Sequence, residues 1–303
     1  MADVLVVGGC AIDLKATSAA PLVPETSNPG FTSATPGGVG RNIAENLARL
    51  GTSVRLVSRV GDDPFGRLVH SETIRAGVDM AGVHSDAERT PTYVAVLDSD
   101  GSLDVAVADF GAIDTMTPDH LNPRWFSDVD QVVLDANLPL PVIAAAISEA
   151  DRVGAMTTLE TVSVAKARRL VQLYERGLAV HLITPNEDEY AALAEEIDPL
   201  LLASWVCVRR GARGSRLLVG TSADPLDIPA VAVPDHEIRD VTGAGDSATA
   251  GLIHALVHGG GLEEAVAFGH TVAAHTVRSD LTVSPDLADV VFTPAHTTAQ
   301  EDP

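Results

Sequence analysis

The chain has 303 residues, of which 46% are hydrophobic, and 42 acidic against 20 basic side chains give it a net charge of −22. A chain this acidic is poorly suited to bind nucleic acid or an anionic membrane surface. It contains no apolar run of about 18 residues, so no membrane span is predicted. Only two lysines, Lys15 and Lys166, are present. With this charge balance a polyanionic substrate would need local donors, and we expect backbone amides and metal ions to bind it.

The N-terminal stretch MADVLVVGGC lacks a basic region ahead of its apolar run. Residues 4–9 therefore predict a buried strand and not a signal peptide. Cys10 and Cys207 have no partner at zinc or CxxC spacing. This cysteine usage indicates a reducing compartment, and we expect a cytoplasmic protein.

Turn and cap residues divide the first part of the chain. Segment 12–36 is rich in Pro, Ser and Thr and predicts an excursion of short strands. Asp63 is a suitable N-cap, with Pro64 at the first helical position and Gly77 as a stop. The elements expected after the excursion are a helix at 41–50, a strand at 53–61, a helix at 64–76 and a hairpin at 92–109.

From residue 131 onward, strand and helix patterns alternate. The strands are expected at 131–136, 155–160, 179–184 and 205–211, and the helices at 141–152, 163–176 and 186–195. This alternation predicts βαβ crossovers and hence an α/β fold, a doubly wound, mostly parallel sheet with helices on both faces. We expect one domain over 1–303, with a polar, acidic tail from about residue 285 that is partly disordered at its end.

Polar residues follow the predicted strands at the edge where open α/β sheets bind ligands. They are Asp13, Asn137, Glu160, Asn186 and Arg209. Each alone is typical of a cap or a turn. Five at equivalent positions favour a ligand site.

Three glycines stand close together in TPGGVGRN, residues 35–42. The segment lacks the lysine and hydroxyl pair of a P-loop and the last glycine of a dinucleotide fingerprint. It is either a plain turn or the seat of a polar, hydroxyl-rich ligand. Glycines let such a ligand approach the backbone, and Asn42 adds a polar group at the start of a helix.

A second glycine segment, DVTGAGDSATAG at 240–251, also leads into a helix. Its small residues expose successive N–H groups at a helix N-terminus, which favours an anion. Asp246 follows in the first turn, either as an ordinary helix-terminal carboxylate or as a base. An anion site beside a base is the arrangement of a kinase that acts on an alcohol.

These segments resemble the signatures of the phosphofructokinase B family, the ribokinase-like sugar and nucleoside kinases. PGGVGRNIAENLARLG, with Gly61 beyond it, is similar to the first signature, and DVTGAGDSATAG to the second. TPNEDEY at 184–190 resembles the intermediate Asn-x-x-Glu motif, and the likeness covers nearly all of the chain. It implies a ribokinase-like fold in which 12–36 and 92–109 form a small β-sheet lid, which often also serves as the interface of a homodimer.

The resemblance also implies roles for single residues. For catalysis these are Asp246 as the base and the backbone of Gly243, Ala244 and Gly245 as an anion hole. Contacts to the acceptor's hydroxyls are implied for Asp13, Gly38 and Asn42. Contacts to ATP are implied for Asn186, Arg209, Gly211 and Gly214.

Metal roles are implied at two places. Glu189 would organise Mg²⁺ through water, and Asp240 and Thr242 match a K⁺ site found in many members. Glu160 departs from the family, which commonly has an Asp-Pro pair there, and the resemblance assigns it no role.

Within the family, the segments TSNPG, TPTYVAVLDSDG and LDAN resemble those of bacterial pseudouridine kinases. The implied reaction is Mg²⁺-dependent transfer from ATP to the 5′-hydroxyl of pseudouridine. A kinase for ribose, adenosine or a keto-deoxy sugar acid stays open, as does a catalytically silent sugar-binding protein. The residues expected to face the base are Asn137, Lys166 and Thr92, although Lys166 could equally be a solvated surface group.

Overall fold

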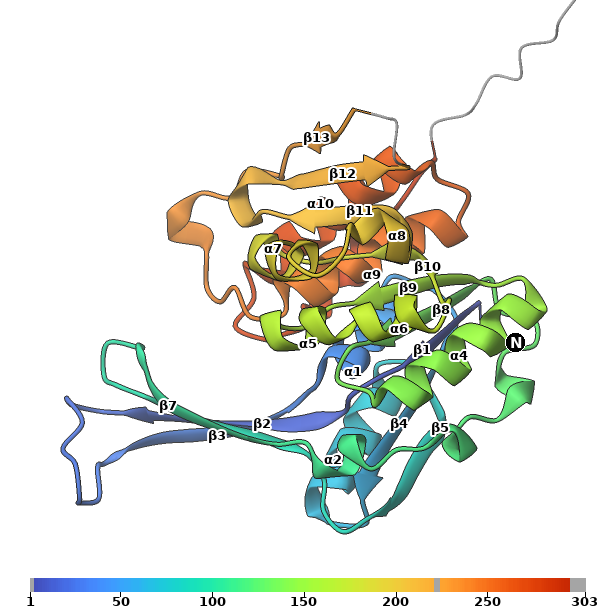
Figure 1. The fold of residues 1–303 in the computed structure, drawn as a ribbon. Coiled ribbons are helices and arrows are strands. Elements are labelled where there is room, and N and C mark those ends of the chain that lie inside the picture. The colour runs from blue at the N-terminus through green and yellow to red at the C-terminus, as the bar shows by residue number, and fades with distance from the viewer. Residues whose placement is uncertain (1–2, 221–223, 295–303) are drawn as a thin grey trace, which may run out of the picture.

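The protein is described by a computed structural model that covers residues 3–220 and 224–294. Its chain forms a large sheet, helices on both sides of that sheet, and a second, small sheet that projects from the body (Figure 1). No helix within these residues is long and apolar enough to cross a membrane.

The large sheet has nine strands in the order β13-β12-β11-β10-β9-β8-β1-β4-β5. All neighbours are parallel except at β12 and β13, which pair antiparallel at one edge. The central strands are apolar runs buried on both faces, as parallel strands require. The strand bounds are β1 Val4–Val7, β4 Val54–Gly61, β5 Asp79–Ala87, β8 Gln131–Asp135, β9 Met156–Glu160, β10 Val180–Ile183, β11 Ala203–Arg209, β12 Ser215–Val219 and β13 Leu226–Ile228.

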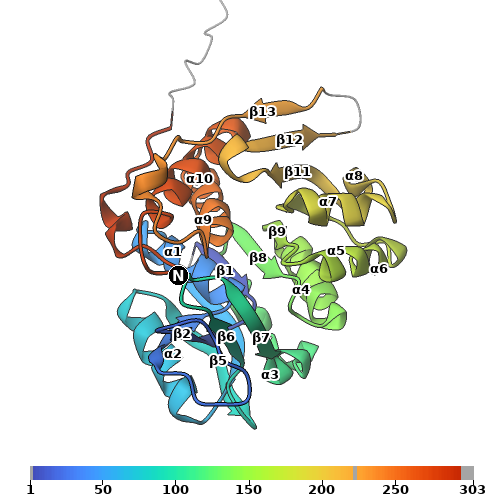
Figure 2. The same ribbon diagram turned by 90° about the vertical axis from the view of Figure 1, so that its left-hand side faces the viewer.

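Helices cover both faces of this sheet and bury two apolar clusters against it (Figure 2). One face carries α1 Val39–Arg49, α2 Pro64–Arg75, α9 Ala244–Val257 and α10 Leu262–Thr276. The other carries α3 Gly111–Asp114, α4 Leu140–Val153, α5 Val164–Arg169, α6 Val171–Glu175, α7 Glu187–Ala194 and α8 Pro199–Leu202. Single 3₁₀ turns are η1 Pro118–His120, η2 Pro123–Trp125, η3 Gly211–Arg213, η4 Asp235–Glu237 and η5 Pro285–Asp289. The predicted fold class is confirmed.

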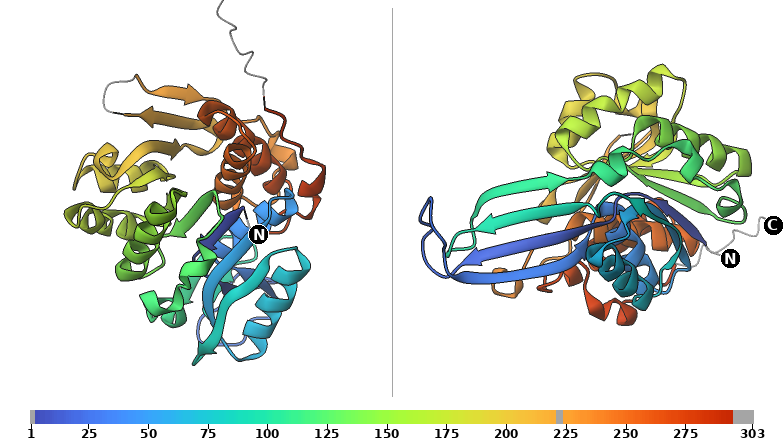
Figure 3. Two further views of the ribbon diagram at one scale, coloured as in Figure 1. Left: turned by 90° about the vertical axis from the view of Figure 1, so that its right-hand side faces the viewer. Right: turned by 90° about the horizontal axis from the view of Figure 1, so that it is seen from below.

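The small sheet has the order β3-β2-β6-β7. It is built from β2 Ala11–Ser18, β3 Gly30–Gly37, β6 Thr92–Leu97 and β7 Leu103–Asp109, and it extends away from the body as a separate layer (Figure 3). The β6–β7 hairpin turns at Gly101, whose backbone φ of 85° is readily adopted by glycine. The two segments that interrupt the α/β alternation thus form one sheet.

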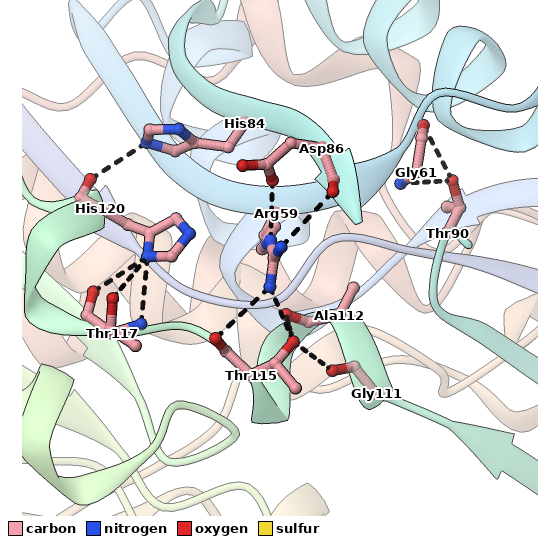
Figure 4. A network of polar contacts seen from close by, with 10 residues as sticks. All are labelled: Arg59, Gly61, His84, Asp86, Thr90, Gly111, Ala112, Thr115, Thr117 and His120. Atoms are coloured by element: carbon pink, nitrogen blue, oxygen red, sulfur yellow. Dashed lines mark hydrogen bonds and ion pairs between the residues drawn. The ribbon is translucent and has the colours of Figure 1, made fainter. Parts of the chain in front are cut away.

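Polar contacts fix both roots of the β6–β7 hairpin (Figure 4). Before β6, Oγ1 of Thr90 accepts a hydrogen bond from the amide of Gly61 at 3.1 Å. After β7, Nη1 of Arg59 donates to Oγ1 of Thr115 at 2.8 Å, while its Nε donates to Asp86 at 2.7 Å. Strands β4 and β5 of the body therefore anchor the segments that enter and leave the hairpin.

Strands β5, β12 and β13 and helix α10 were not predicted from the sequence, and two of the expectations differ from the structure. The helix predicted at 163–176 is divided into α5 and α6, because Leu170 and Leu173 each donate to the residue three before them, as in a 3₁₀ turn. The tail predicted from about residue 285 begins with η5, whose Leu287 is fully buried. The end of that tail, 295–303, lies outside the described residues.

Candidate active site

The second glycine segment starts helix α9 and forms a candidate anion hole. Gly243 is the N-cap residue and has a left-handed backbone with φ 79°. The amide of Ala244 donates to the carbonyl oxygen of Val241 at 3.2 Å, which closes the turn. Among the described residues, the amides of Gly245 and Asp246 have no protein acceptor. These two N–H groups at the positive end of a helix are therefore available to an anion.

Asp246 lies beside these amides in the first turn of α9. Its Oδ2 accepts a hydrogen bond from Nδ2 of Asn42 at 2.8 Å, which joins the two glycine segments. Burial raises the pKa of the Asp246 carboxyl to about 7. The hydrogen bond from Asn42 acts in the opposite direction, and the negative charge of Glu160 adds to the rise. A carboxylate with this pKa is suited to take a proton from an alcohol near neutral pH.

Asp135, at the end of β8, holds the first glycine segment against the sheet. Its Oδ2 accepts hydrogen bonds from the amides of Gly9 at 2.7 Å and Gly40 at 2.9 Å. The packing leaves no room for a side chain, since a Cβ at Gly40 would lie 2.7 Å from the backbone of Gly8. Burial raises the pKa of Asp135, and these hydrogen bonds lower it. The sequence prediction missed Asp135, whose only signal is an acidic residue at the end of an apolar run.

Asn42 is oriented by its neighbours in α1. Nη2 of Arg41 donates to Oδ1 of Asn42 at 2.6 Å, and Arg41 also pairs with Glu45 one turn further along. All three side chains are buried. Because the amide oxygen of Asn42 is occupied by Arg41, its NH₂ group is left to donate to Asp246.

Asp13 approaches the same place from β2. Its carboxylate lies against Gly37, where a Cβ would collide with it. Burial raises the pKa of Asp13, and the nearby charge of Arg41 lowers it. At Gly38 the backbone φ is 95°, and a Cβ would lie 2.5 Å from the carbonyl oxygen of Gly9. The structure thus brings together the predicted acceptor contacts Asp13, Gly38 and Asn42.

Lys166 is not a solvated surface group. Its Nζ donates to Oδ1 of Asn137 and lies 5.5 Å from the centre of the Phe110 ring. Desolvation lowers the pKa of Lys166, and the charge of Asp135 raises it. Nζ of Lys166 and Nδ2 of Asn137 are N–H donors, which suit a carbonyl oxygen of a ligand.

Thr92 does not lie on the same face of the small sheet as Asp13. In the parallel pairing of β2 with β6, Thr92 lies opposite Ile12 and Tyr93 lies opposite Asp13. Successive strand residues point to opposite faces, so Thr92 and Asp13 are on different sides of the small sheet. This register corrects the expectation for Thr92 and places Tyr93 on the face of Asp13.

A buried carboxylate, Glu160, supports the anion hole from behind. It accepts hydrogen bonds from Oγ1 of Thr184 at 2.7 Å and from Oγ1 of Thr249 in α9 at 3.0 Å. Nη2 of Arg209 donates to it at 2.6 Å. A Cβ at Gly245 would lie 2.5 Å from Nη1 of Arg209, so the guanidinium is directly next to the anion hole. Glu160 therefore positions both Arg209 and α9, a role that the sequence did not indicate.

Asn186 and Glu189 cap helix α7 reciprocally. Oδ1 of Asn186 accepts from the amide of Glu189 at 2.9 Å, and Oε2 of Glu189 accepts from the amide of Asn186 at the same distance. Oε2 also accepts from Oγ1 of Thr161 at 2.6 Å, whereas Oε1 has one donor, Nδ2 of Asn186 at 3.0 Å. Within 3–220 and 224–294, no three His, Cys, Asp or Glu residues form a group that could hold a metal ion. Since it has a single donor, Oε1 of Glu189 can accept a further hydrogen bond.

A cavity of about 560 Å³ opens beside the anion hole. Its volume is in the range of small-molecule sites, and apolar side chains such as Val231, Val233 and Ile238 line part of it. Ala244 and Gly245 of the anion hole line it as well. So do all four residues expected to contact ATP, which are Asn186, Arg209, Gly211 and Gly214.

Asp240 and Thr242 lie just ahead of the anion hole. Oδ1 of Asp240 accepts from the amide of Thr242 at 2.8 Å. Its Oδ2 accepts from Nζ of Lys15, which reaches across from β2, at 3.0 Å. Both oxygens of this carboxylate are therefore engaged by donors of the chain.

The geometry agrees with the outcome of comparison with known proteins. Residues 1–288 match the family of pfkB carbohydrate kinases. The chain belongs to this family. It is 30% identical to the pseudouridine kinase of Escherichia coli over 300 residues, which cover 94% of this chain and 93% of that enzyme. It is 29% identical to the ribokinase of Bacillus subtilis, with 92% and 94% covered.

Solved structures of pfkB relatives agree in fold. A carbohydrate kinase from Agrobacterium tumefaciens is 32% identical and superposes with a TM-score of 0.81, covering 96% of this chain and 95% of that one. An Arabidopsis thaliana ribokinase complexed with ribose and ATP also gives 0.81, covering 95% and 97%, and at 23% identity it is a likeness of fold alone. The protein is thus a carbohydrate or nucleoside kinase of the pfkB family, whose members transfer phosphoryl groups to hydroxyls.

Proposed function

We propose that this kinase transfers the γ-phosphoryl group of ATP to the 5′-hydroxyl of pseudouridine, giving pseudouridine 5′-phosphate and ADP. The observation that carries the proposal is the hydrogen bond between Asn42 and Asp246, because it joins the acceptor loop to the anion hole at one point. The choice of pseudouridine is supported by the 30% identity to a pseudouridine kinase over 94% of the chain.

In the proposed step, the 5′-oxygen attacks the γ-phosphorus in line with the leaving oxygen of ADP. Asp246 takes the hydroxyl proton as the new P–O bond forms and the bond from the γ-phosphorus to the β–γ bridging oxygen breaks. The free amides of Gly245 and Asp246 stabilise the charge on the transferred group. Arg209 adds a positive charge beside them.

We assign ATP to the cavity beside the anion hole. Its apolar wall suits the adenine ring, and the absence of side chains at Gly211 and Gly214 lets the nucleotide approach the backbone. When bound, Mg²⁺ would neutralise part of the charge of the ATP phosphates. Glu189 would hold the ion through water, since its Oε1 has a single donor and can accept another hydrogen bond.

The N–H donors of Lys166 and Asn137 favour an acceptor whose nucleobase carries carbonyl oxygens. Uridine and pseudouridine both carry such oxygens, so this pair favours a uracil ring but does not separate the two isomers. Separation depends on N1–H, which is free only in pseudouridine. A site that pairs a substrate N–H rejects an analogue lacking it, because its own acceptor is then left unsatisfied.

A coupled ADP assay with pseudouridine, uridine, adenosine and ribose tests the assignment. We expect kcat/KM for pseudouridine to exceed that for uridine by at least about tenfold. The relationship to ribokinase makes ribose the second candidate. A preference for ribose would change the proposed acceptor but not the assignment of the protein as a kinase. Phosphorylation of none of these acceptors would favour a sugar-binding protein without activity.

The small sheet is proposed to act as a lid and as the interface of a homodimer. By register, one face presents Asp13 and Lys15 toward the site. The opposite face is apolar and partly exposed, with Leu14, Val94, Val96, Val105 and Val107. A lid that closes over the acceptor would keep water from the phosphoryl group.

A further inference from the structure

Strand β2 extends Lys15 toward the segment that precedes α9. Nζ of Lys15 and Oδ2 of Asp240 are 3.0 Å apart, and the two side chains are only 33% and 27% exposed. Asp13 and Lys15 are two residues apart in one strand, so their side chains point to the same face. The face that presents Asp13 to the acceptor therefore also presents a cation to Asp240.

Asp240 also belongs to the backbone turn that leads to the anion hole. Its second oxygen accepts the amide hydrogen of Thr242, immediately before Gly243. The carboxylate is thus held between a lysine of the small sheet and the backbone of the anion-hole segment.

A potassium ion does not fit this arrangement. Asp240 and Thr242 match the family's K⁺ site, yet here one oxygen of Asp240 faces an ammonium group and the other accepts the amide hydrogen of Thr242. The lysine head group is a compact point charge. A second cation against the same oxygen would meet like-charge repulsion at close range.

We propose that the Lys15 ammonium takes the place of a monovalent metal ion at the anion-hole segment, so that this kinase works without potassium. Lys15 is a positioning residue that acts through Asp240 and Thr242 on the amides beyond Gly243. Because Lys15 belongs to the small sheet, movement of that sheet over an acceptor would position the cation and the anion hole together. The inference rests on the proposed kinase function.

The test compares turnover in potassium chloride and in tetramethylammonium chloride at equal ionic strength, with all other counter-ions as tetramethylammonium. Wild type is expected to have the same kcat in both salts. Lys15→Met keeps an apolar stem without the charge. It is expected to lose at least about tenfold in kcat without potassium and to regain most of it with potassium, while the acceptor KM changes less. Lys15→Arg is expected to stay independent of potassium.

Lys166→Met is the matched control, since it removes the charge of the other lysine. It should show one level of activity in both salts. Thermal unfolding gives a readout without turnover, because potassium should raise the Tm of Lys15→Met and leave that of wild type unchanged. Several-fold stimulation of wild type by potassium, or a Lys15→Met enzyme with full activity in both salts, would overturn the inference. If wild type phosphorylates no acceptor, the proposed function fails instead, and the Tm comparison still decides the role of Lys15.

Discussion

Asp246 is an ordinary carboxylic acid whose surroundings fit it for proton transfer. Burial favours its neutral form, and the hydrogen bond from Asn42 stabilises its charged form. The balance places the pKa of Asp246 at about 7, which keeps the ionised form available near neutral pH and makes it a stronger base than a solvated aspartate. Arg41 controls this balance indirectly, because it fixes the orientation of the Asn42 amide.

The pH dependence of turnover follows from this pKa. Only ionised Asp246 can accept the hydroxyl proton, so kcat/KM should fall about tenfold per pH unit below a midpoint near the pKa of about 7 and level off above it. Asn42→Leu removes a hydrogen bond that lowers the pKa, and its midpoint should therefore move to higher pH. A pH–rate profile over about pH 5.5 to 9 measures both. A flat profile for wild type across the acidic half would contradict the base assignment.

Lys166→Ala tests recognition of the nucleobase of the acceptor. Loss of the ammonium removes a hydrogen-bond donor from the site of the phosphoryl acceptor. We therefore expect KM for pseudouridine to rise about tenfold and KM for ATP to stay nearly constant. The matched control is Arg168→Ala, on the same helix, whose exposed side chain pairs with Glu195 and Glu196. Steady-state kinetics with each substrate varied in turn separates the two constants. An equal rise in both KM values would show that Lys166 does not face the acceptor.

The grouping of residues was predictable where a motif is local and not where distant segments meet. Gly243, Gly245 and Asp246 form their site within a few consecutive residues, so the sequence displays it. The pair between Lys15 and Asp240 joins residues 225 positions apart, and no local pattern announces it. The expectation for Thr92 was wrong for a different reason. A shift of one residue in register moves a strand side chain to the other face of the sheet.

The small sheet is held at its roots, and beyond them β2 contacts the body through Lys15. Asp63 caps α2 and also accepts from the amide of Thr90 at 2.7 Å, ahead of β6. Arg59 fixes Thr115 behind β7, as Figure 4 shows. Farther out, β7 exposes most of its residues. Motion of the sheet is therefore expected about these roots, with β2 carrying Asp13 and Lys15 along.

Hydrogen exchange tests the lid. Saturating pseudouridine should slow amide exchange in 11–18 and 92–109, because closure shields the strands that face the acceptor. The anchored segment 59–66 is the internal reference and should change little. Unchanged exchange in both strand segments, with acceptor binding verified by calorimetry, would show that the small sheet does not act as a lid.

The elements of the body that were predicted have signals of their own, whereas β5, β12, β13 and α10 were not predicted. Asp63, Pro64 and Gly77 delimit α2 within one or two residues, and apolar runs mark β1 and β8. The division between α5 and α6 carries no comparable signal. It arises from the i→i+3 bonds at Leu170, in a segment that contains neither glycine nor proline.

At the scale of the whole molecule, the apolar outer face of the small sheet predicts a homodimer. Val105 and Val107 are 49% and 64% exposed in the single chain, and pairing two copies would remove them from water. Light scattering should therefore give twice the chain mass of 31.5 kDa. Val107→Lys should shift the protein toward monomer, whereas Ile74→Lys, at an exposed apolar site on α2, should not. A wild type that is monomeric at micromolar concentration would contradict this interface.

The fold of the whole chain could be inferred from sequence because alternating strands and helices leave few topologies, and the motifs occur in the order of the family. The acceptor is less accessible to such reasoning. It depends on a few donors, Lys166 and Asn137 among them, whose positions are set by tertiary packing and not by local pattern.

Asp246 is proposed to act as the base in the phosphorylation of pseudouridine. The most direct measurement is quantification by mass spectrometry of pseudouridine 5′-phosphate and ADP formed by wild type and by Asp246→Asn from ATP and pseudouridine. Wild type should form the two products in equal amounts. Asp246→Asn should form them about 10²-fold more slowly or worse, with ATP affinity nearly unchanged. Turnover of Asp246→Asn within about threefold of wild type, or no pseudouridine 5′-phosphate from wild type, would contradict the account.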